Sequence, residues 1–227
     1  MKNCIFTILT TGISLAATAQ GVGIEAGANL NRFQYDAIGS EIQTTLRPGF
    51  RTGIVAEEAI SDQLAFQYGV YYTTKSSNIS INRNFIDGSS AVQQKTNGYI
   101  RVSHLEIPMS ILYHTTPKTG NRFFVGGGPY LGIALGGVIS FDRDVVTSSN
   151  GNSITRSLIA KFPLDIGSAT TDDIKRIDAG LQVQTGYELA SGIFTRLSGS
   201  YSATDIDPSP DKARNLNLAL TIGYMIR

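Results

Sequence analysis

The sequence contains few of the residues on which most enzyme and metal sites depend. Its 227 residues include one cysteine, two histidines and no tryptophan. The single cysteine, Cys4, lies at the start of the chain, so a disulfide framework, cysteine nucleophiles and cysteine-based metal sites are excluded from the rest. Two histidines without cysteine also disfavour a zinc site. We therefore expect no catalytic residue, no metal and no cofactor.

An excess of charge and a long apolar run are missing as well. The chain has 19 basic and 18 acidic residues, which gives no electrostatic signature of a nucleic-acid partner. Beyond the first nineteen residues no run of 18 apolar residues occurs, as a membrane helix would need. If this chain enters a membrane, β-strands must carry it there.

The first nineteen residues have the pattern of a secretory signal peptide. A short basic start, Met1–Asn3, precedes the mostly apolar stretch Cys4–Ala16, and Ala17–Ala19 forms an A-x-A cleavage site. We expect cleavage before Gln20, which leaves residues 20–227 as one domain outside the cytoplasm.

The sequence is rich in strict alternation of apolar and other residues. From Leu216 to Ile226 every second residue is leucine, isoleucine or tyrosine, and those between are mostly small or polar. Alternation with a period of two indicates a β-strand with two unlike faces. Its eleven residues match a tilted strand crossing a bilayer, which needs about 9–11.

Eight such stretches follow the signal, an even number, as in single-chain bacterial barrels. They are Val22–Arg32, Gly49–Glu58, Leu64–Lys75, Ile100–His114, Phe123–Gly137, Arg176–Leu189, Ile193–Ala203 and Arg214–Arg227. Short connections (61–63, 115–122, 190–192) alternate with long ones (33–48, 76–99, 138–175, 204–213). This sorting is typical of outer-membrane proteins, with short turns on the periplasmic side. The sequence thus predicts an all-β fold: an eight-stranded antiparallel up-and-down transmembrane β-barrel.

Aromatic residues on the predicted outward faces fall near the two rims. Rings prefer the membrane interface, so we expect two aromatic girdles around an aliphatic band. The predicted girdle residues are Phe50, Phe66, Tyr72, Tyr113, Phe123, Tyr187, Tyr201 and Tyr224.

Four segments resemble the small outer-membrane β-barrel family typified by PorT, from Gram-negative bacteria. They are Leu105–Pro108, Gly128–Gly132, Ile222–Tyr224 and, less strongly, Tyr72–Lys75, and the resemblance covers essentially the whole chain after the signal. It implies an eight-stranded barrel in the cell outer membrane, often without known activity. PorT itself is linked to a protein secretion system, so a contribution to secretion is the family-level expectation. The chain departs from the family by closing on Ile226-Arg227 rather than on an aromatic residue.

Charged residues gather on the predicted inward faces. The lumen of an eight-stranded barrel is barely wide enough for side chains, so buried charges there must be paired. We expect a network of ion pairs that fills the lumen, and a gate or proton path remains the functional alternative. The predicted network consists of Glu25, Arg51, Glu57, His104, Glu106, Glu188 and Arg196, and Lys75 also faces inward.

Two further features invite specific expectations. Pro108 and Pro129 lie at a similar height in neighbouring predicted strands, which indicates one shared β-bulge, because proline cannot donate to a strand ladder. The long connection 138–175 contains the apolar piece Leu158–Leu164. This piece could fold over the barrel mouth or dock a partner, and the sequence does not choose.

The resulting functional hypothesis is a non-enzymatic membrane scaffold that contacts other proteins. Its expected partners are outer-membrane lipid, the outer-membrane assembly machinery, and proteins at the extracellular loops or the periplasmic rim. A soluble lipocalin-like barrel for a small apolar ligand is one alternative, and it would need apolar faces inward. A lipid-modifying enzyme is another, for which only His104 and His114 could join a serine and an acid.

Overall fold

The computed structural model describes residues 21–35, 42–88, 90–115, 120–149, 152–167, 169, 171–208 and 212–227. The expected signal segment, 1–19, lies outside the described residues. Among those described, no helix has the length and apolar content to cross a membrane.

The described chain forms nine β-strands. They are β1 (Gly21–Tyr35), β2 (Ile42–Ala59), β3 (Leu64–Asp87), β4 (Ser90–His114), β5 (Arg122–Ser149), β6 (Asn152–Pro163), β7 (Ile177–Glu188), β8 (Ile193–Ser202) and β9 (Ala213–Ile226). Eight correspond to the eight alternating stretches of the sequence, with differences of at most one residue where a stretch runs past the end of its strand. The ninth, β6, lies in the connection 138–175, where the sequence analysis predicted no strand.

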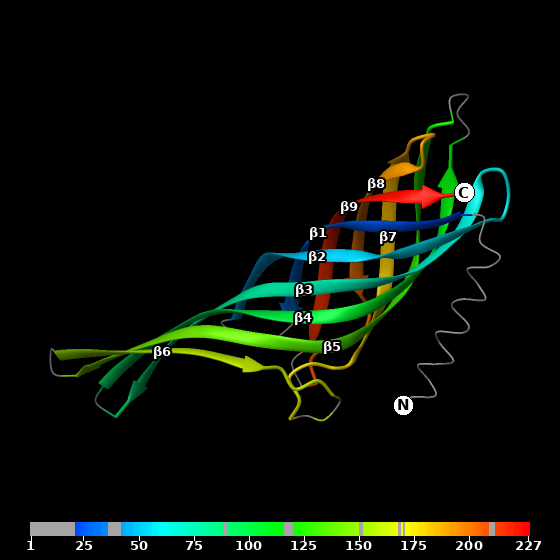
Figure 1. Ribbon diagram of the computed structural model, residues 1–227. Coiled ribbons are helices and arrows are strands. Elements are labelled where there is room, and N and C mark those ends of the chain that lie inside the picture. Colours follow the sequence, from blue (N-terminus) through cyan, green and yellow to red (C-terminus); the bar gives the residue numbers. More distant parts are fainter. Residues whose placement is uncertain are drawn as a thin grey trace.

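Eight of the strands close a ring of antiparallel neighbours (Figure 1). The order runs β1–β2–β3–β4–β5–β7–β8–β9, and β9 returns to β1 through a ladder from Val22↔Ile226 to Tyr35↔Ala213. Strand β6 stands outside this ring because it pairs with the far part of β5 before the chain comes back to form β7. The predicted eight-stranded antiparallel barrel is confirmed.

The strands on one side of the ring are far longer than a bilayer requires. Strands β3, β4 and β5 have 24, 25 and 28 residues, whereas a crossing needs about 9–11. Their distal parts continue with β6 as a sheet that projects away from the end where the C-terminus lies (Figure 1). We call this sheet, made of residues 79–87, 90–99, 138–149 and 152–163, the extension. Short turns occupy the opposite end, including one in which Gly192 has φ of 88°.

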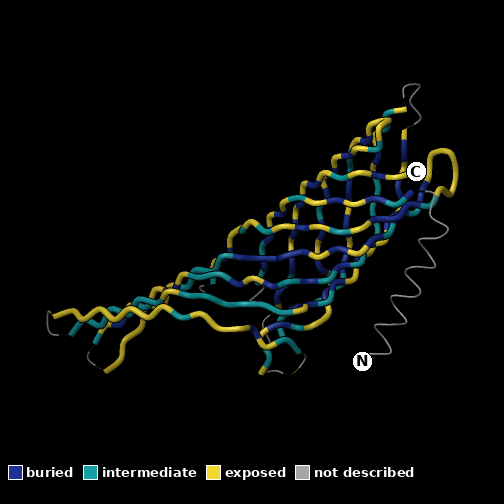
Figure 2. The backbone as a smooth tube through the Cα atoms, in the orientation of Figure 1, coloured by how far each residue is buried: buried dark blue, intermediate teal, exposed yellow. Residues whose placement is uncertain are grey.

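Burial alternates along the barrel strands (Figure 2), and the exposed residues include many large apolar ones. In β9 Leu218, Leu220 and Ile222 are exposed, whereas the alternate residues Asn217 and Thr221 are buried. An apolar exterior around a polar interior is the reverse of what a lipocalin-like barrel requires, so that alternative is wrong.

The two prolines do not produce the expected bulge. Pro108 faces Tyr130 and Pro129 faces Leu181 in an unshifted register. The shift in the β4–β5 ladder lies instead between Ser103 and His104. An extended φ suits proline in a strand, so losing its N–H weakens the ladder without changing the register. A second shift lies between Leu46 and Arg51 of β2, a segment that does contain a proline, Pro48.

Candidate functional site: the charged lumen and its two ends

The centre of the lumen holds four charged side chains from four strands. Lys75 Nζ lies 3.0 Å from Glu106 Oε2 and 2.8 Å from Asp178 Oδ2. Arg51 pairs with the other oxygen of Glu106. All four side chains are at most 3% exposed, so two cations neutralise two carboxylates in the buried interior. This satisfies the requirement that buried charges be paired and hydrogen-bonded.

Asp178 connects this centre to the other strands. Its carboxylate accepts hydrogen bonds from Tyr130 Oη at 3.1 Å, Ser202 Oγ at 2.5 Å and Asn215 Nδ2 at 3.1 Å. Together with Lys75 these donors come from β3, β5, β8 and β9. A single carboxylate on β7 thus links strands from most of the ring.

A second buried pair lies next to the first. Arg196 Nη1 on β8 is 3.0 Å from Glu25 Oε2 on β1 and donates to Tyr71 Oη at 3.1 Å. The Tyr71 ring in turn lies under the Arg51 guanidinium, 3.9 Å from its centroid, in a cation–π contact. The two pairs therefore form one packed layer of charge and aromatic surface.

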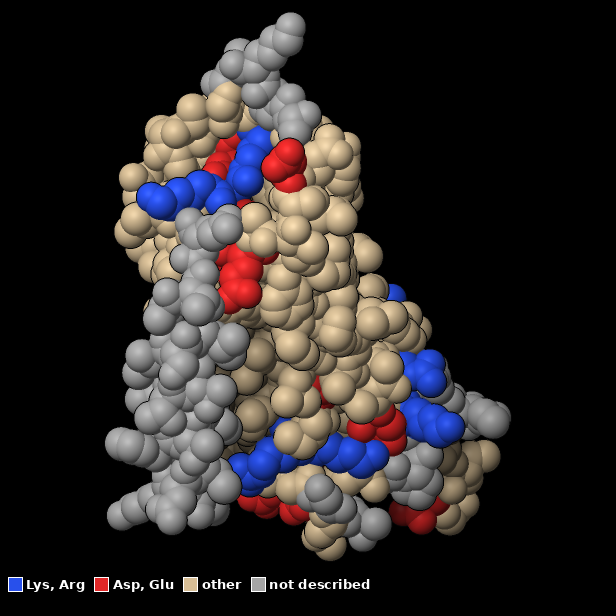
Figure 3. All heavy atoms as spheres, turned by 90° about the vertical axis from the view of Figure 1, so that its right-hand side faces the viewer, with Lys and Arg blue, Asp and Glu red and all other residues tan. Residues whose placement is uncertain are grey.

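The periplasmic end of the lumen carries an ionic cluster. Arg122 Nη2 lies 3.0 Å from Glu57 and 2.9 Å from Glu188. Arg227 contacts the same two carboxylates, at 2.9 and 3.1 Å. His114 Nε2 is 3.4 Å from Glu57. In Figure 3, which views the molecule from the side of the C-terminus, basic and acidic side chains gather at the upper end.

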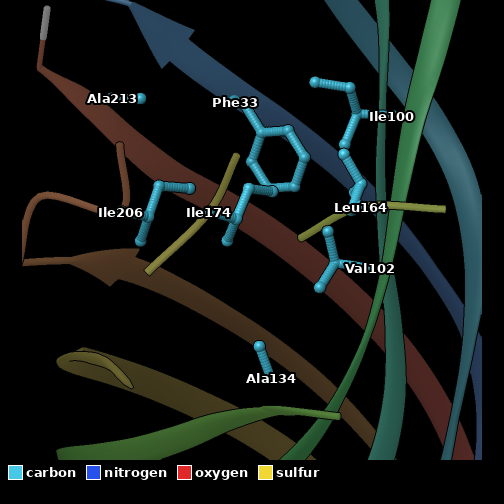
Figure 4. Packing of buried hydrophobic residues seen from close by; sticks show 8 residues of the cluster. All are labelled: Phe33, Ile100, Val102, Ala134, Leu164, Ile174, Ile206 and Ala213. Atoms are coloured by element: carbon cyan, nitrogen blue, oxygen red, sulfur yellow. The ribbon is translucent and has the colours of Figure 1, made fainter. Parts of the chain in front are cut away.

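The outer end of the lumen is closed by apolar side chains, which we call the cap (Figure 4). Leu164 and Ile174 from the β6–β7 connection and Ile206 from the β8–β9 connection pack together over the barrel mouth. Their neighbours from the wall are Phe33, Ile100, Val102, Ala134 and Ala213. The apolar piece 158–164 is therefore divided: Leu164 is buried in the cap, whereas Ile159 and Phe162 stay exposed on the extension.

Polar contacts hold the two cap connections together. Lys175 donates its backbone N–H to the carbonyl of Ile206 at 2.9 Å, and its Nζ lies 2.8 Å from Asp205 Oδ2. Partial burial alone would raise the pKa of the Asp205 carboxyl. The hydrogen bonds from Lys175 and from the N–H groups of Ala213 and Asp207 outweigh it and hold that pKa below its ordinary value.

All seven predicted lumen residues are buried in the interior, and six take part in ion pairs. His104 joins no ion pair among the described residues, and its Nδ1 has no hydrogen-bond partner there. The prediction omitted Asp178, Arg122 and Arg227. The alternation in β7 places Asp178 on the inward face. The two arginines lie at strand ends, where alternation says little about the direction of a side chain.

The eight predicted girdle residues lie on the outer surface. Seven are exposed, and Phe66 is partly covered by Tyr68, with ring centroids 5.7 Å apart. Phe50 and Tyr72 form a tilted pair with centroids 5.5 Å apart.

Neither histidine receives a hydrogen bond from a serine among the described residues. Both are buried in the lumen, and His114 has no hydrogen-bond partner at either ring nitrogen within the described part of the chain. Ser202, the serine nearest to a buried acid, donates to Asp178 and not to an imidazole. The described residues also contain no cluster of three or more metal-ligating side chains.

Eight closed strands, an apolar exterior and a charged lumen define an integral outer-membrane β-barrel. The family model of the outer membrane protein beta-barrel domain matches residues 18–207, well over half of the chain. The protein belongs to this family, and its location is the outer membrane.

Several solved barrels are similar at low identity. Ail from Yersinia pestis is 13% identical, with 91% of this chain and 98% of that chain covered and a TM-score of 0.34. Neisserial surface protein A is 14% identical, with 89% and 96% covered and a TM-score of 0.36. The N-terminal barrel domain of Pseudomonas aeruginosa OprF is 11% identical, with 92% and 98% covered and a TM-score of 0.31. At these values the similarities carry no argument about function. No curated protein matches the chain.

Proposed function

We propose that the protein is a non-enzymatic, PorT-like scaffold of the outer membrane whose extension docks other proteins, and that it takes part in protein secretion. The observation that carries the docking role is the exposure of large apolar side chains on the extension. Ile86 at the tip of β3 is 79% exposed and Ile159 on β6 is 78% exposed. Ile154, Leu158 and Phe162 on β6 are exposed as well.

The position of these residues on the extension makes their exposure an indication of a binding surface. Apolar side chains on the barrel wall are solvated by lipid tails, whereas the extension lies beyond the length needed for a crossing. Its apolar residues therefore face water unless a partner covers them. Concentrated apolar exposure in water is typical of surfaces that bind other molecules.

The lumen supports a structural rather than a transporting role. Its centre is occupied by paired charges, its periplasmic end by the Glu57–Glu188 cluster and its outer end by the cap. A lumen filled with paired side chains suits a membrane anchor rather than a channel. The secretion role rests on the PorT-like segments alone, because a fold by itself does not imply a function.

In-cell photo-crosslinking tests the docking role. A photoreactive amino acid at Ile159 should capture a protein of the cell surface or a secreted protein, identified by mass spectrometry. The matched control is the same amino acid at Leu220, a lipid-facing residue of β9, which should capture none. Equal yields at the two positions, or none at Ile159, would contradict the proposal.

A shortened variant tests the link to secretion and the non-enzymatic role. Removing residues 141–160 deletes most of the β5–β6 hairpin and leaves the ladder of β5 with β7 untouched. We expect a heat-modifiable barrel in the outer membrane and less secreted protein. Unchanged secretion would count against the secretion role.

The lipid profile of a strain that lacks the whole protein tests the non-enzymatic role. A changed profile would favour a lipid-modifying enzyme instead.

A further inference from the structure

Strand β6 is an edge strand of unusual length. All twelve of its residues pair with β5, from Val138↔Pro163 to Ser149↔Asn152, without a register shift. In the described part of the chain no strand lies on its other side, and the sheet order ends at β6. Figure 2 shows this strand exposed along most of its course.

An edge of this kind presents backbone groups for pairing. In an antiparallel ladder every second residue of β6 directs its N–H and C=O away from β5. Proteins usually protect such edges with short strands, bulges, proline or charged side chains, above all lysine. In β6 the only proline, Pro163, is its last residue, so the free edge is twelve residues long.

The side chains of β6 indicate what kind of strand would fit. Arg156 and Lys161 are its only charged residues, so the edge carries two positive charges and no negative charge. On β5, Asp144 already accepts a hydrogen bond from Ser157 at 2.6 Å, and Asp142 lies opposite Ile159, two residues from Lys161. A pairing strand with carboxylates opposite Arg156 and Lys161 would gain two favourable cross-strand pairs.

We propose that β6 accepts an extended acidic segment of a partner protein as an added strand of the sheet. Backbone hydrogen bonds supply much of the affinity in such β-augmentation, and the alternate side chains supply the selectivity. The inference rests on the proposed docking function and names the chemistry of the partner.

A second copy of this chain is a poorer occupant. An antiparallel pair of two β6 strands would bring two arginines and two lysines to one shared edge, with no carboxylate on either β6 strand to balance them. Like charges on paired strands repel each other. The same charges that attract an acidic strand thus oppose self-pairing.

Binding to a synthetic strand tests the proposal. The probe is a fluorescein-labelled twelve-residue peptide of valine and threonine with two glutamates five residues apart, the spacing that places one carboxylate opposite Arg156 and one opposite Lys161. It is added to the full-length protein in nanodiscs of uncharged lipid. When the peptide saturates the protein, amide hydrogen exchange should slow in about half of the β6 residues, those whose N–H points away from β5. A peptide of the same length and charge with two valines replaced by proline should bind weakly, because proline cannot donate.

Charge reversal supplies the matched variants. The double variant Arg156→Glu/Lys161→Glu should weaken the binding of the peptide about tenfold, because two attractive cross-strand pairs become repulsive. The control, Arg83→Glu/Lys95→Glu, makes the same change on the exposed β3–β4 hairpin of the extension and should alter affinity less than about twofold.

Three results would overturn the inference. They are binding of the peptide with unchanged amide exchange in β6, equal weakening of binding by the two double variants, and concentration-dependent dimers that form through β6 instead.

A failure of the strand-pairing proposal can be distinguished from a failure of the docking function. If Ile159 still crosslinks to a protein in cells that carry Arg156→Glu/Lys161→Glu, docking stands and strand pairing is wrong. If Ile159 captures nothing in the unaltered protein, docking itself fails.

Discussion

The ammonium group of Lys75 on β3 lies 2.8 Å from the carboxylate of Asp178 on β7, with β4 and β5 between these strands in the ring. The contact therefore spans the lumen rather than following the ladder. Backbone pairing holds each strand to its two neighbours only, whereas this ion pair connects two strands that are not paired with each other. The lumen network thus adds a second set of connections to the barrel.

Removing the cation of this network should destabilise the barrel strongly. Lys75→Met leaves Glu106 with Arg51 alone and Asp178 without a cation among the described residues, and breaking a buried pair costs about 3–5 kcal/mol. Urea unfolding in detergent micelles measures this free energy. Lys161→Met, on the exposed β6, is the control and should cost less than about 0.5 kcal/mol. Similar losses in the two variants would show that the pairing contributes little.

The Glu25–Arg196 pair permits a double-mutant cycle. Arg196→Met leaves a buried carboxylate unpaired, so it should lower the unfolding free energy markedly. Adding Glu25→Gln removes that charge and should recover part of the loss, giving a coupling energy of about 1–3 kcal/mol. Additive effects of the two substitutions would indicate that the residues stabilise the barrel independently, contrary to the 3.0 Å contact.

Glycine should be required where β5 approaches β4 closely. A Cβ added at Gly126 would lie 2.0 Å from the carbonyl oxygen of Ile111, so Gly126→Ala must displace backbone. We expect a loss of about 1–3 kcal/mol in unfolding free energy. Gly136 is the matched control in the same strand, since a Cβ there meets nothing within 4 Å. An unchanged unfolding free energy in Gly126→Ala would show that the β4–β5 ladder accommodates the added Cβ at little cost.

The boundary between barrel and extension can be located by arginine substitution. Leu220→Arg places a charge on the lipid-facing side of β9 and should cost about 2–4 kcal/mol near the bilayer centre. Ile159→Arg, on the extension, should cost almost nothing, because that side chain faces water. Refolding yield and unfolding free energy in lipid vesicles measure both. An equally large cost at Ile159 would place the extension within the membrane.

Acid should loosen the cap through Asp205. Its pKa is lower in the folded protein than the ordinary value of 3.8, so the unfolded state binds the proton more tightly. The stabilisation is therefore fully present above about pH 4 and is lost as the pH falls through the folded-state value. Methyl NMR of Ile174 and Ile206 in micelles should show a transition below pH 3.8. Asp205→Asn should abolish it, and a transition that persists in this variant would assign it to another group.

Local alternation was sufficient to predict which residues form the ring. The eight stretches and their facing follow from a period of two, since successive side chains of any strand point to opposite sides. The inward position of residues such as Glu106 and Arg196 follows from the same rule. Strand β6 was missed because the pattern of its apolar residues, Ile154, Leu158, Ile159 and Phe162, does not alternate and every side chain is at least partly exposed.

The sequence by itself determined the number of barrel strands, the face that meets lipid and the set of charges that had to be buried. Only the tertiary structure decided which of those charges meet, that Leu164 closes the mouth while Ile159 stays exposed, and that β6 has a free edge. The physical reason is the separation along the chain over which each property is decided. The side to which a residue points depends only on the neighbouring residues of its own strand. Partners across the lumen, such as Lys75 and Asp178, depend instead on the stagger of the closed ring, which sets strands far apart in sequence at one height.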